Sequence, residues 1–325
     1  MPLVKPRYIL AGPLVLALLA PLTLSFAAPS PFMGERMPYA AFDELQTTPL
    51  KVEGGILNVG FAPGATALPR AEILAWLQKS AHAVALYYGR FPVSAARVLI
   101  VPVDGRGVTG GQAFGYRGAA IRLMLGRDST AADLTQDWKA VHEMVHLALP
   151  DVDDTHLWLA EGLAVYVESI ARVQAGDLTP RKIWTDFSND MPQGLPRAGD
   201  RGIDQTPTWG RRYWGGALFA LMADIEVRRR TDNRIGLQQA LRAILAAGGN
   251  HEQDWPMSKI FATADAATGQ TVLADMYAAW RTTPVTPDLA ALWRGLGVIP
   301  AASGATFDDT APLAATRRAI EAKPG

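Results

Sequence analysis

The spacing of apolar and polar positions changes near residue 126, and this change predicts two regions of different structure. In the first region, residues 68–92 repeat apolar positions with a helical period that ends at Gly89. Short apolar runs and alternations around this helix are typical of strands. They cover residues 50–61, 96–103, 111–118 and 119–126, the third of which is rich in glycine and also reads as a loop. We therefore expect a small mixed β-sheet with one helix.

After residue 126 the pattern is mainly helical. Helices are predicted over residues 129–150, 155–174, 180–189, 209–230, 236–247, 271–281 and 287–295. Ser129 or Thr130 caps the first of these helices, and Pro150 ends it. The polar connection 189–210 is rich in proline and glycine, and long loops of this kind often form lids over functional sites.

Together these patterns predict an α+β fold, in which a small mixed β-sheet lobe precedes a mainly helical lobe. We place the sheet lobe at residues 28–126 and the helical lobe at residues 127–300, followed by a C-terminal tail at 301–325. The most conspicuous motif lies where the two lobes meet.

The first 27 residues have the pattern of a secretory signal peptide. Lys5 and Arg7 precede an apolar run over residues 9–26, which ends in small residues suited to a cleavage site. The alternative is an uncleaved membrane anchor formed by the same run, which is almost long enough to span a bilayer. Two prolines interrupt the run and favour cleavage. We therefore predict an exported protein, with contact to a membrane only if the signal is retained.

The amino-acid composition limits which partners the protein is expected to bind and in which compartment it is expected to act. Removing 27 of the 325 residues leaves 298, with 29 basic and 31 acidic side chains, which gives no electrostatic basis for binding nucleic acid. The chain has no cysteine, so disulfides and thiolate metal sites are excluded. An exported chain without cysteine fits a bacterial periplasm better than a eukaryotic secretory route. Any metal must be held by histidine and carboxylate.

The stretch "AVHEMVH" carries two histidines four residues apart on a predicted helix. Such residues share one helical face, so His142 and His146 can bind one metal ion. Glu143 lies about 100° around the helix axis from His142. There it can accept a proton from a metal-bound water without being a ligand itself. The alternative is that both histidines are surface or capping residues.

A catalytic zinc site needs a third protein ligand. Glu161 lies on the next predicted helix, and a short turn through "PDVDD" would bring this helix back across the first. His156 is the rival ligand, but it stands at the start of the helix, where a polar residue needs no special reason. We therefore favour Glu161.

"HEMVH" followed by "WLAEGLAVYVE" resembles the gluzincin metallopeptidases, the group that contains thermolysin and the aminopeptidase-N and glycyl-aminopeptidase types. The latter two share the run Trp-x-x-Glu-Gly-x-Ala-x-Tyr, found here over residues 158–166. The resemblance covers about residues 133–244 and extends more weakly to 296. It implies a thermolysin-like zincin catalytic domain with Zn²⁺ as cofactor, in which the ligands are His142, His146 and Glu161 and the general base is Glu143.

The stretch that begins "RRYWGG" is similar to a glycyl-aminopeptidase helix that opens with a tyrosine and a glycine. By this resemblance Tyr213 is the catalytic residue whose hydroxyl stabilises the oxyanion. Without it, a tyrosine beside Trp214 in an apolar helix is most simply a packing residue. The two preceding arginines, Arg211 and Arg212, are candidates to hold a substrate carboxylate or carbonyl.

The chain departs from the family pattern in the support of its histidines. Thermolysin-type sites carry an aspartate four residues after the ligand glutamate, where this chain has Val165. Glu168 lies seven residues after Glu161, on nearly the same helical face, and is a candidate substitute partner for a zinc histidine. The alternative is that Glu168 is a solvated helix residue.

Aminopeptidase relatives hold the free amine of the substrate with a glutamate in a glycine-containing strand, but "GGQAFGYRG" has no acid. This departure favours an endopeptidase whose edge strand pairs with an extended peptide, with Gly111 and Gln112 as substrate-binding residues. Ordinary turn glycines explain the stretch equally well.

The sequence therefore predicts an enzyme, a zinc metallopeptidase that hydrolyses a peptide or protein substrate with metal-activated water and a glutamate base. Two alternatives stay open. One is a zinc hydrolase of a small amide or cell-wall substrate. The other is an envelope binding or maturation protein with a vestigial site.

Overall fold

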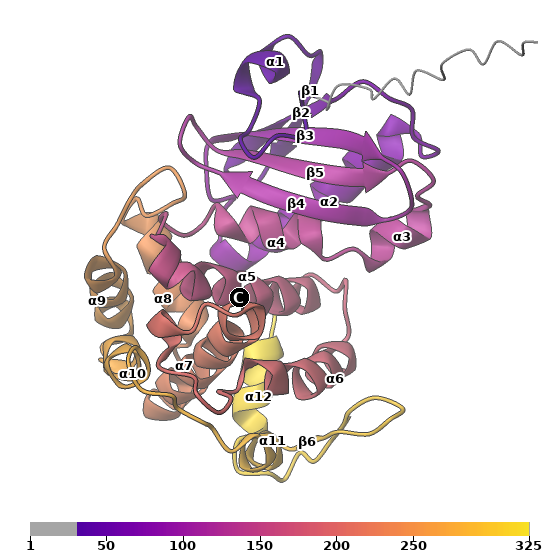
Figure 1. The fold of residues 1–325 in the computed structure, drawn as a ribbon. Coiled ribbons are helices and arrows are strands. Elements are labelled where there is room, and N and C mark those ends of the chain that lie inside the picture. The colour runs from indigo at the N-terminus through magenta and orange to yellow at the C-terminus, as the bar shows by residue number, and fades with distance from the viewer. Residues whose placement is uncertain (1–30, 325) are drawn as a thin grey trace, which may run out of the picture.

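The computed structural model describes residues 31–324. The predicted signal peptide, residues 1–27, and the alternative membrane anchor, residues 9–26, lie outside the described residues. Within residues 31–324, no helix has both the length and the apolar character needed to cross a membrane. Figure 1 shows a β-sheet region stacked on a helical region, as the sequence predicts.

The sheet has five strands in the order β1-β2-β3-β5-β4. Their bounds are β1 Thr47–Val52, β2 Gly55–Phe61, β3 Ala95–Val103, β4 Val108–Phe114 and β5 Ala120–Gly126. The pairs β2–β3 and β3–β5 are parallel, whereas β1–β2 and β4–β5 are antiparallel, so the sheet is mixed. The predicted strand 50–61 is in fact a hairpin, because Gly54 turns the chain with a φ of 87°. Strand β4 forms one edge of the sheet.

Helices cover one face of the sheet, and the N-terminal segment covers the other. Helix α2 (Arg70–Tyr88) ends at Gly89, whose φ of 82° is the left-handed conformation that glycine adopts readily. On the opposite face lies α1 (Tyr39–Asp43), where Phe32, Met37 and Phe42 pack against the sheet residues Leu99 and Val101. Both faces are therefore buried, which explains the almost continuous apolar run of β3.

The remaining elements are mostly helices. Their bounds are α3 Ala131–Gln136, α4 Lys139–His146, η1 Asp154–His156, α5 Leu157–Gln174, α6 Pro180–Asp190, η2 Met191–Gly194, η3 Ile203–Gln205, η4 Arg211–Gly215, α7 Gly216–Arg230, α8 Leu237–Ala246, α9 Met257–Thr268, α10 Val272–Trp280, α11 Leu289–Leu296, β6 Val298–Ile299, β7 Thr306–Phe307 and α12 Ala314–Glu321. Among these, η2, η3, α9, β6, β7 and α12 were not predicted from the sequence.

The single helix predicted over residues 129–150 is two helices, α3 and α4. Thr130 caps the first, because its hydroxyl accepts the Asp133 N–H at 3.4 Å and its own N–H donates to the Asp133 carboxylate at 2.7 Å. Asp137 then adopts an extended backbone with ψ of 141° and accepts the Ala140 N–H at 3.0 Å. A carboxylate that caps a new helix thus interrupts an otherwise continuous helical pattern.

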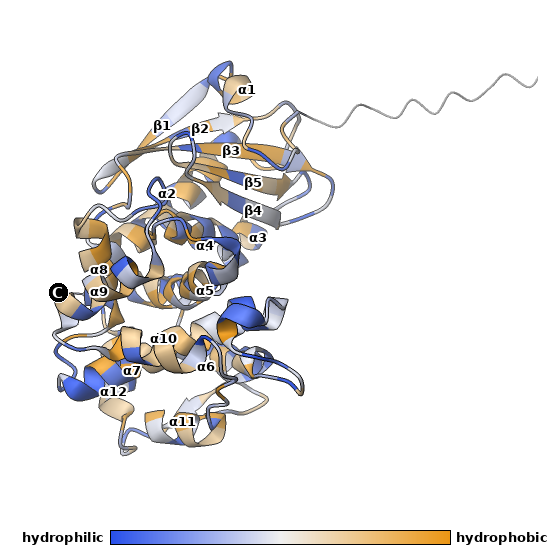
Figure 2. Cartoon of the chain, turned by 60° about the vertical axis from the view of Figure 1, so that its left-hand side comes forward, coloured by the Kyte–Doolittle hydropathy of each residue, from blue (hydrophilic) through white to orange (hydrophobic). Residues whose placement is uncertain are grey.

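The two regions share one hydrophobic core. The same cluster runs from the sheet and α2 through α4 and α5 to α7, α8 and α9. Figure 2 shows apolar residues on β3 and on the helices packed around α5. The segment 301–325, expected as a tail, carries β7 and α12, and Ile320 of α12 belongs to this core. Helix α5 is therefore held from several sides, which gives the residues it carries a fixed position.

Candidate metal centre

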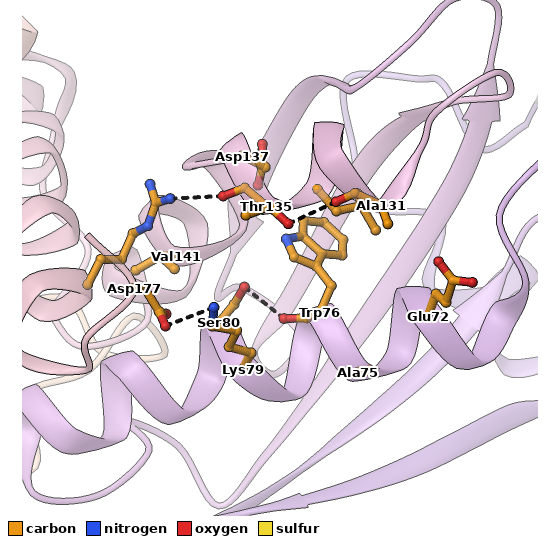
Figure 3. Close-up of a pocket in the computed structure, with 12 residues that line it drawn as sticks. Glu72, Ala75, Trp76, Lys79, Ser80, Ala131, Thr135, Asp137, Val141 and Asp177 are labelled. Carbon is orange, nitrogen blue, oxygen red and sulfur yellow. Dashed lines mark hydrogen bonds and ion pairs between the residues drawn. The ribbon is translucent and has the colours of Figure 1, made fainter. Parts of the chain in front are cut away.

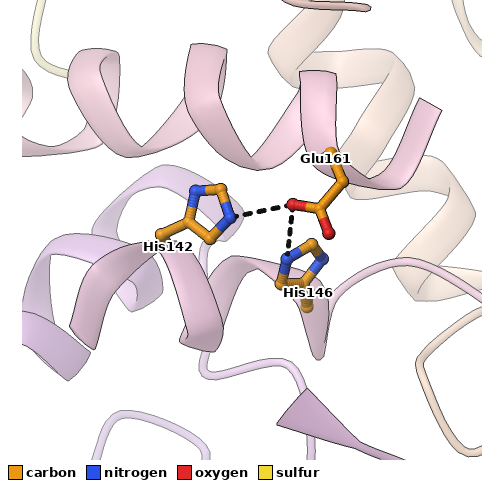
Figure 4. Close-up of side chains that lie close together, drawn as sticks. All are labelled: His142, His146 and Glu161. Carbon is orange, nitrogen blue, oxygen red and sulfur yellow. Dashed lines mark hydrogen bonds and ion pairs between the residues drawn. The ribbon is translucent and has the colours of Figure 1, made fainter. Parts of the chain in front are cut away.

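Helices α4 and α5 bring His142, His146 and Glu161 together. Nε2 of His142 lies 3.1 Å from Oε2 of Glu161, and Nε2 of His146 lies 3.5 Å from the same oxygen. Figure 4 shows both imidazole rings directed from α4 toward the carboxylate on α5. All candidate ligand atoms lie within 4.8 Å of one another, so the structure gathers the three residues predicted as zinc ligands into one group.

The rival ligand His156 does not join this group. Its Nε2 lies 3.1 Å from the hydroxyl of Tyr277, and its Nδ1 lies 3.0 Å from the Asp153 carboxylate. The residue ends the short helix η1 at the beginning of α5, one and a half turns of helix before Glu161. Its side chain is therefore used in fastening the start of α5.

Glycine contacts set the position of α5 relative to α7. A Cβ atom added at Gly162 would overlap the backbone of Gly216, so the two helices cross at the distance that only glycine allows. Gly162 follows Glu161 directly, and Gly216 begins the helix that follows Tyr213. This contact explains why a glycine comes after the glutamate in the motif. It also places Tyr213 beside the metal-binding group.

Glu143 lies next to the ligands and is almost completely buried, with 7% of its surface exposed. Its carboxyl faces the edge strand, where a Cβ added at Gly111 would lie 2.7 Å from Oε1. Burial raises the pKa of Glu143 to about 7, and the nearby Glu161 charge adds to this, while His146 and the Ala113 N–H oppose it. Glu143 is thus a carboxyl group suited to exchanging protons near neutral pH.

The two histidines differ in how readily they are protonated. Burial lowers the pKa of His142 to about 4, so this imidazole is neutral at pH 7 and free to act as a ligand. Burial also opposes protonation of His146, but the Glu161 carboxylate outweighs it and raises the His146 pKa. Burial disfavours the charged form of Glu161, yet its bonds to both histidines lower its pKa overall. The group therefore contains a carboxylate held by two imidazole nitrogens.

Tyr213 stacks on His142, with ring centroids 6.1 Å apart and an angle of 9° between the planes. It lies in η4, a π-helical turn at the start of α7, and such turns occur frequently at functional sites. Burial and the charge of Glu161 raise the pKa of its hydroxyl well above the ordinary value. Tyr213 is therefore a neutral hydrogen-bond donor facing the metal-binding group.

The donors present fit a zinc ion. Two imidazole nitrogens and one carboxylate oxygen that converge from two helices are the set found in catalytic zinc sites. Nδ1 of His142 is buried without a hydrogen-bond partner among residues 31–324, so no second carboxylate orients the ring through this nitrogen. The position that carries an aspartate in thermolysin-type sites is Val165, which cannot accept a hydrogen bond.

Glu168 does not take the place of the missing aspartate. Its carboxylate accepts a hydrogen bond from Arg172 Nη1 at 2.6 Å and another from the Ser169 hydroxyl at 3.1 Å. Burial raises the pKa of Glu168, and Arg172 partly offsets this effect. The candidate role of Glu168 as a histidine partner is therefore wrong, because the charge of the buried Arg172 holds it elsewhere.

A cleft of about 410 Å³ opens over the three candidate metal ligands. Both predicted substrate-binding residues, Gly111 and Gln112, line it, although the Gln112 side chain also accepts a hydrogen bond from Arg122 at 2.9 Å. His251 lines the cleft too and was not predicted. A Cβ at Gly115 would overlap the carbonyl of His251, so this loop closes one end of the cleft against β4. No spacing in the sequence links His251 to the motif.

The connection 189–210 is fastened to the helices and is not a detached lid. Trp158 Nε1 donates to Asp204 Oδ1 at 2.8 Å, and a Cβ at Gly194 would overlap the backbone of Trp214 and Gly215. The buried Arg211 donates to the Gly194 carbonyl and does not line the cleft. This arginine therefore holds the connection against η4 and does not reach a substrate in the cleft.

A separate pocket of about 280 Å³ lies on the other side of α4. Figure 3 shows Lys79 and Asp177 joined at its wall, with Lys79 Nζ 2.9 Å from Asp177 Oδ1. Arg172 donates a hydrogen bond to the Thr135 carbonyl at 3.5 Å. None of the metal-binding residues lines this pocket. It is therefore distinct from the candidate site.

Neither a protein-family model nor a curated protein sequence matches this chain. The structure is similar to an aminopeptidase N family protein from Idiomarina loihiensis, with a TM-score of 0.57 and 14% identity over 79% of this chain and 50% of that chain. An M1 zinc metallopeptidase from Deinococcus radiodurans gives a TM-score of 0.49 and 14% identity over 75% of this chain and 53% of that chain. The chain thus spans about half the length of these structures. At this identity the likeness shows an α+β fold shared with the first of them.

Proposed function

We propose that this chain is a zinc-dependent peptidase of the gluzincin group, which hydrolyses peptide bonds in a substrate bound along strand β4. The observation that carries the proposal is the convergence of His142 Nε2, His146 Nε2 and Glu161 Oε2, with the Glu143 carboxyl beside them. The fold shared with an aminopeptidase N family protein supports it.

His142, His146 and Glu161 would hold the ion. A zinc ion in such a set polarises a carbonyl group and lowers the pKa of water to about 7. Glu143 supplies the proton transfers, because its pKa of about 7 lets it take a proton from the attacking water and return it to the leaving amine. Its position against Gly111 leaves the carboxyl directed into the cleft and outside the ligand group.

Tyr213 would stabilise the negative charge that develops on the carbonyl oxygen as the peptide bond is attacked. Its hydroxyl keeps its proton at neutral pH, because burial and Glu161 raise its pKa. The stacking on His142 fixes the ring, so the donor needs no reorganisation during the reaction. We further propose that the protein acts after export, on the basis of the signal pattern in its first 27 residues.

Metal analysis and peptide hydrolysis test this function together. We expect about one equivalent of zinc in the purified protein, loss of zinc in His146→Ala, and retained zinc with strongly reduced hydrolysis in Glu143→Gln. His82→Ala is the matched control, since His82 is exposed and bonds to Glu53 away from the cleft. Less than about half an equivalent, unchanged by His146→Ala, would exclude a metal centre of this composition. Full hydrolysis by Glu143→Gln would exclude Glu143 as the base.

A further inference from the structure

Two tryptophans beside the metal-binding group leave much of their surface exposed, 42% for Trp138 and 59% for Trp209. Trp138 directly precedes α4, and its ring lies 5.2 Å from that of His142. Trp209 stacks on Tyr213 at 5.5 Å with 22° between the planes. Exposed aromatic surface next to a catalytic cleft commonly marks a binding site, because indole gains free energy when it leaves water.

These rings line a further pocket of about 400 Å³, which adjoins the cleft over the candidate ligands at Tyr213. Tyr213 lines both this pocket and the cleft over the ligands, so its ring is the shared wall. Val165, Leu178 and Trp214 add further apolar surface. Only the Tyr213 ring would therefore separate a group held in this pocket from His142. Such a group could be the side chain of the residue next to the hydrolysed bond.

The charged side chains that line this pocket already form ion pairs or hydrogen bonds with their neighbours. Lys182 Nζ lies 2.7 Å from Asp186 Oδ1, and Arg172 pairs with Glu168. The remaining carboxylate, Asp190, accepts a hydrogen bond from Gln193 at 3.0 Å. Trp209 contacts Tyr213, and Trp138 contacts His142 and has Lys139 Nζ 4.7 Å from its ring centroid, but both indoles keep exposed apolar surface in this pocket. With the charged groups of the wall already paired, this surface favours an apolar occupant over a charged one.

We propose that this pocket is the specificity subsite of the enzyme and takes a bulky apolar side chain from a residue that flanks the hydrolysed bond. This inference rests on the proposed peptidase function. An aromatic or branched side chain held in this pocket would cover exposed indole surface and displace water from it. Discrimination against alanine at the same position should reach about 10- to 100-fold in kcat/KM.

Peptides that differ only at one residue beside the cleaved bond test this subsite by hydrolysis. We expect the zinc-loaded protein to prefer phenylalanine or leucine over alanine, arginine and aspartate. Because Trp138 and Trp209 contact His142 and Tyr213, their replacement by alanine can slow all substrates, and the readout is the ratio of kcat/KM for the phenylalanine and alanine peptides, which we expect to fall in both variants. Trp76→Ala is the matched control, because Trp76 lines the separate pocket behind α4. A preference for arginine, or an apolar preference that survives both variants, would overturn the inference.

A binding measurement separates this inference from the proposed function. Titrating Glu143→Gln protein with N-acetylphenylalaninamide and N-acetylalaninamide should show tighter binding of the first, and the added change Trp209→Ala should abolish the difference. If no peptide is hydrolysed but this difference appears, the peptidase function fails and the pocket stands. If peptides are hydrolysed and both amides bind alike, the pocket assignment fails alone. Trp209→Phe should restore part of the difference, since it restores an aromatic face.

Discussion

Gly111 lies so close to Glu143 that a side chain at this position has no room. A Cβ atom added to Gly111 would lie 2.6 Å from Cγ and 2.7 Å from Oε1 of Glu143. At this position edge strand β4 therefore presents only its backbone, and no side chain, to the proposed base. The glycine that sequence reasoning assigned to substrate binding also sets where the base lies.

We predict that Gly111→Ala lowers peptide hydrolysis strongly while the protein keeps its zinc. The added methyl group must push the Glu143 carboxyl out of its place, and a displacement of about 1 Å can cost about 100-fold in rate. Steady-state kinetics and metal analysis of the same preparation measure the two effects.

Gly110→Ala is the strand-matched control, because its methyl group would meet only the flexible end of Met124. A small loss of activity in this variant is consistent with the prediction. Equal losses in both variants would mean that strand β4 itself, and not Glu143, is disturbed.

Tyr213→Phe should lower kcat by about 100- to 1000-fold with little change in KM or zinc content. The phenylalanine ring keeps the stacking on His142 and Trp209 and removes only the hydroxyl donor. Tyr166→Phe is the comparison, since the Tyr166 hydroxyl donates to the buried Asp224 at 2.7 Å. That change should cost stability, about 1 kcal/mol in chemical denaturation, and leave kcat nearly intact. Unchanged kcat in Tyr213→Phe would remove the tyrosine from the reaction.

Glu168→Gln should destabilise the fold without weakening zinc binding. The substitution leaves Arg172, only 6% exposed, without its charged partner, and breaking a buried ion pair in this way costs about 3 kcal/mol. Urea denaturation gives the free energy of unfolding, and competition with a chelator gives the zinc affinity. A drop in zinc affinity with unchanged stability would return Glu168 to the role of histidine partner.

Glu226→Gln should have a smaller and pH-dependent effect. Hydrogen bonds from Arg229 and Arg230 lower the pKa of Glu226 to about 2. Because this value is below that of the unfolded chain, about 4.3, the stabilisation is fully present above that pH and declines as the pH falls toward 2. Glu226 and Arg229 are partly exposed. The difference in the free energy of unfolding between Glu226→Gln and the natural protein should therefore stay below about 1 kcal/mol near pH 7. A difference that grows on acidification would contradict this assignment.

The grouping of the three candidate zinc ligands was predictable because these residues follow helical periodicity. His142 and His146 share a face whatever surrounds the helix, and Glu161 needed only a short turn to return to them. The mixed sheet was predictable for a similar reason, since the buried strands β3 and β5 are short apolar runs.

Other parts of the site depend on packing that no local pattern records. His251 reaches the cleft from a turn, and Trp209 lines the adjoining pocket from the first helical residue after the connection 189–208, whose path is set by contacts such as Asp204 with Trp158. For Glu168 the sequence itself carries a signal against the role of histidine partner. Arg172 lies four residues later, the spacing at which opposite charges pair on a helix.

The direction in which Tyr213 points depends on the number of residues in the π-helical turn η4. Gly216 is fixed against Gly162, and a π turn holds one residue more than an α turn. Deleting one residue from Arg211–Gly215 would therefore restore a regular helix and rotate the preceding residues by about 100°. The segment that carries Trp209 would then leave the metal centre, although every ligand would stay in place. A one-residue length change here is therefore expected to displace the proposed oxyanion donor Tyr213 together with the pocket beside it, while the three candidate zinc ligands stay in place.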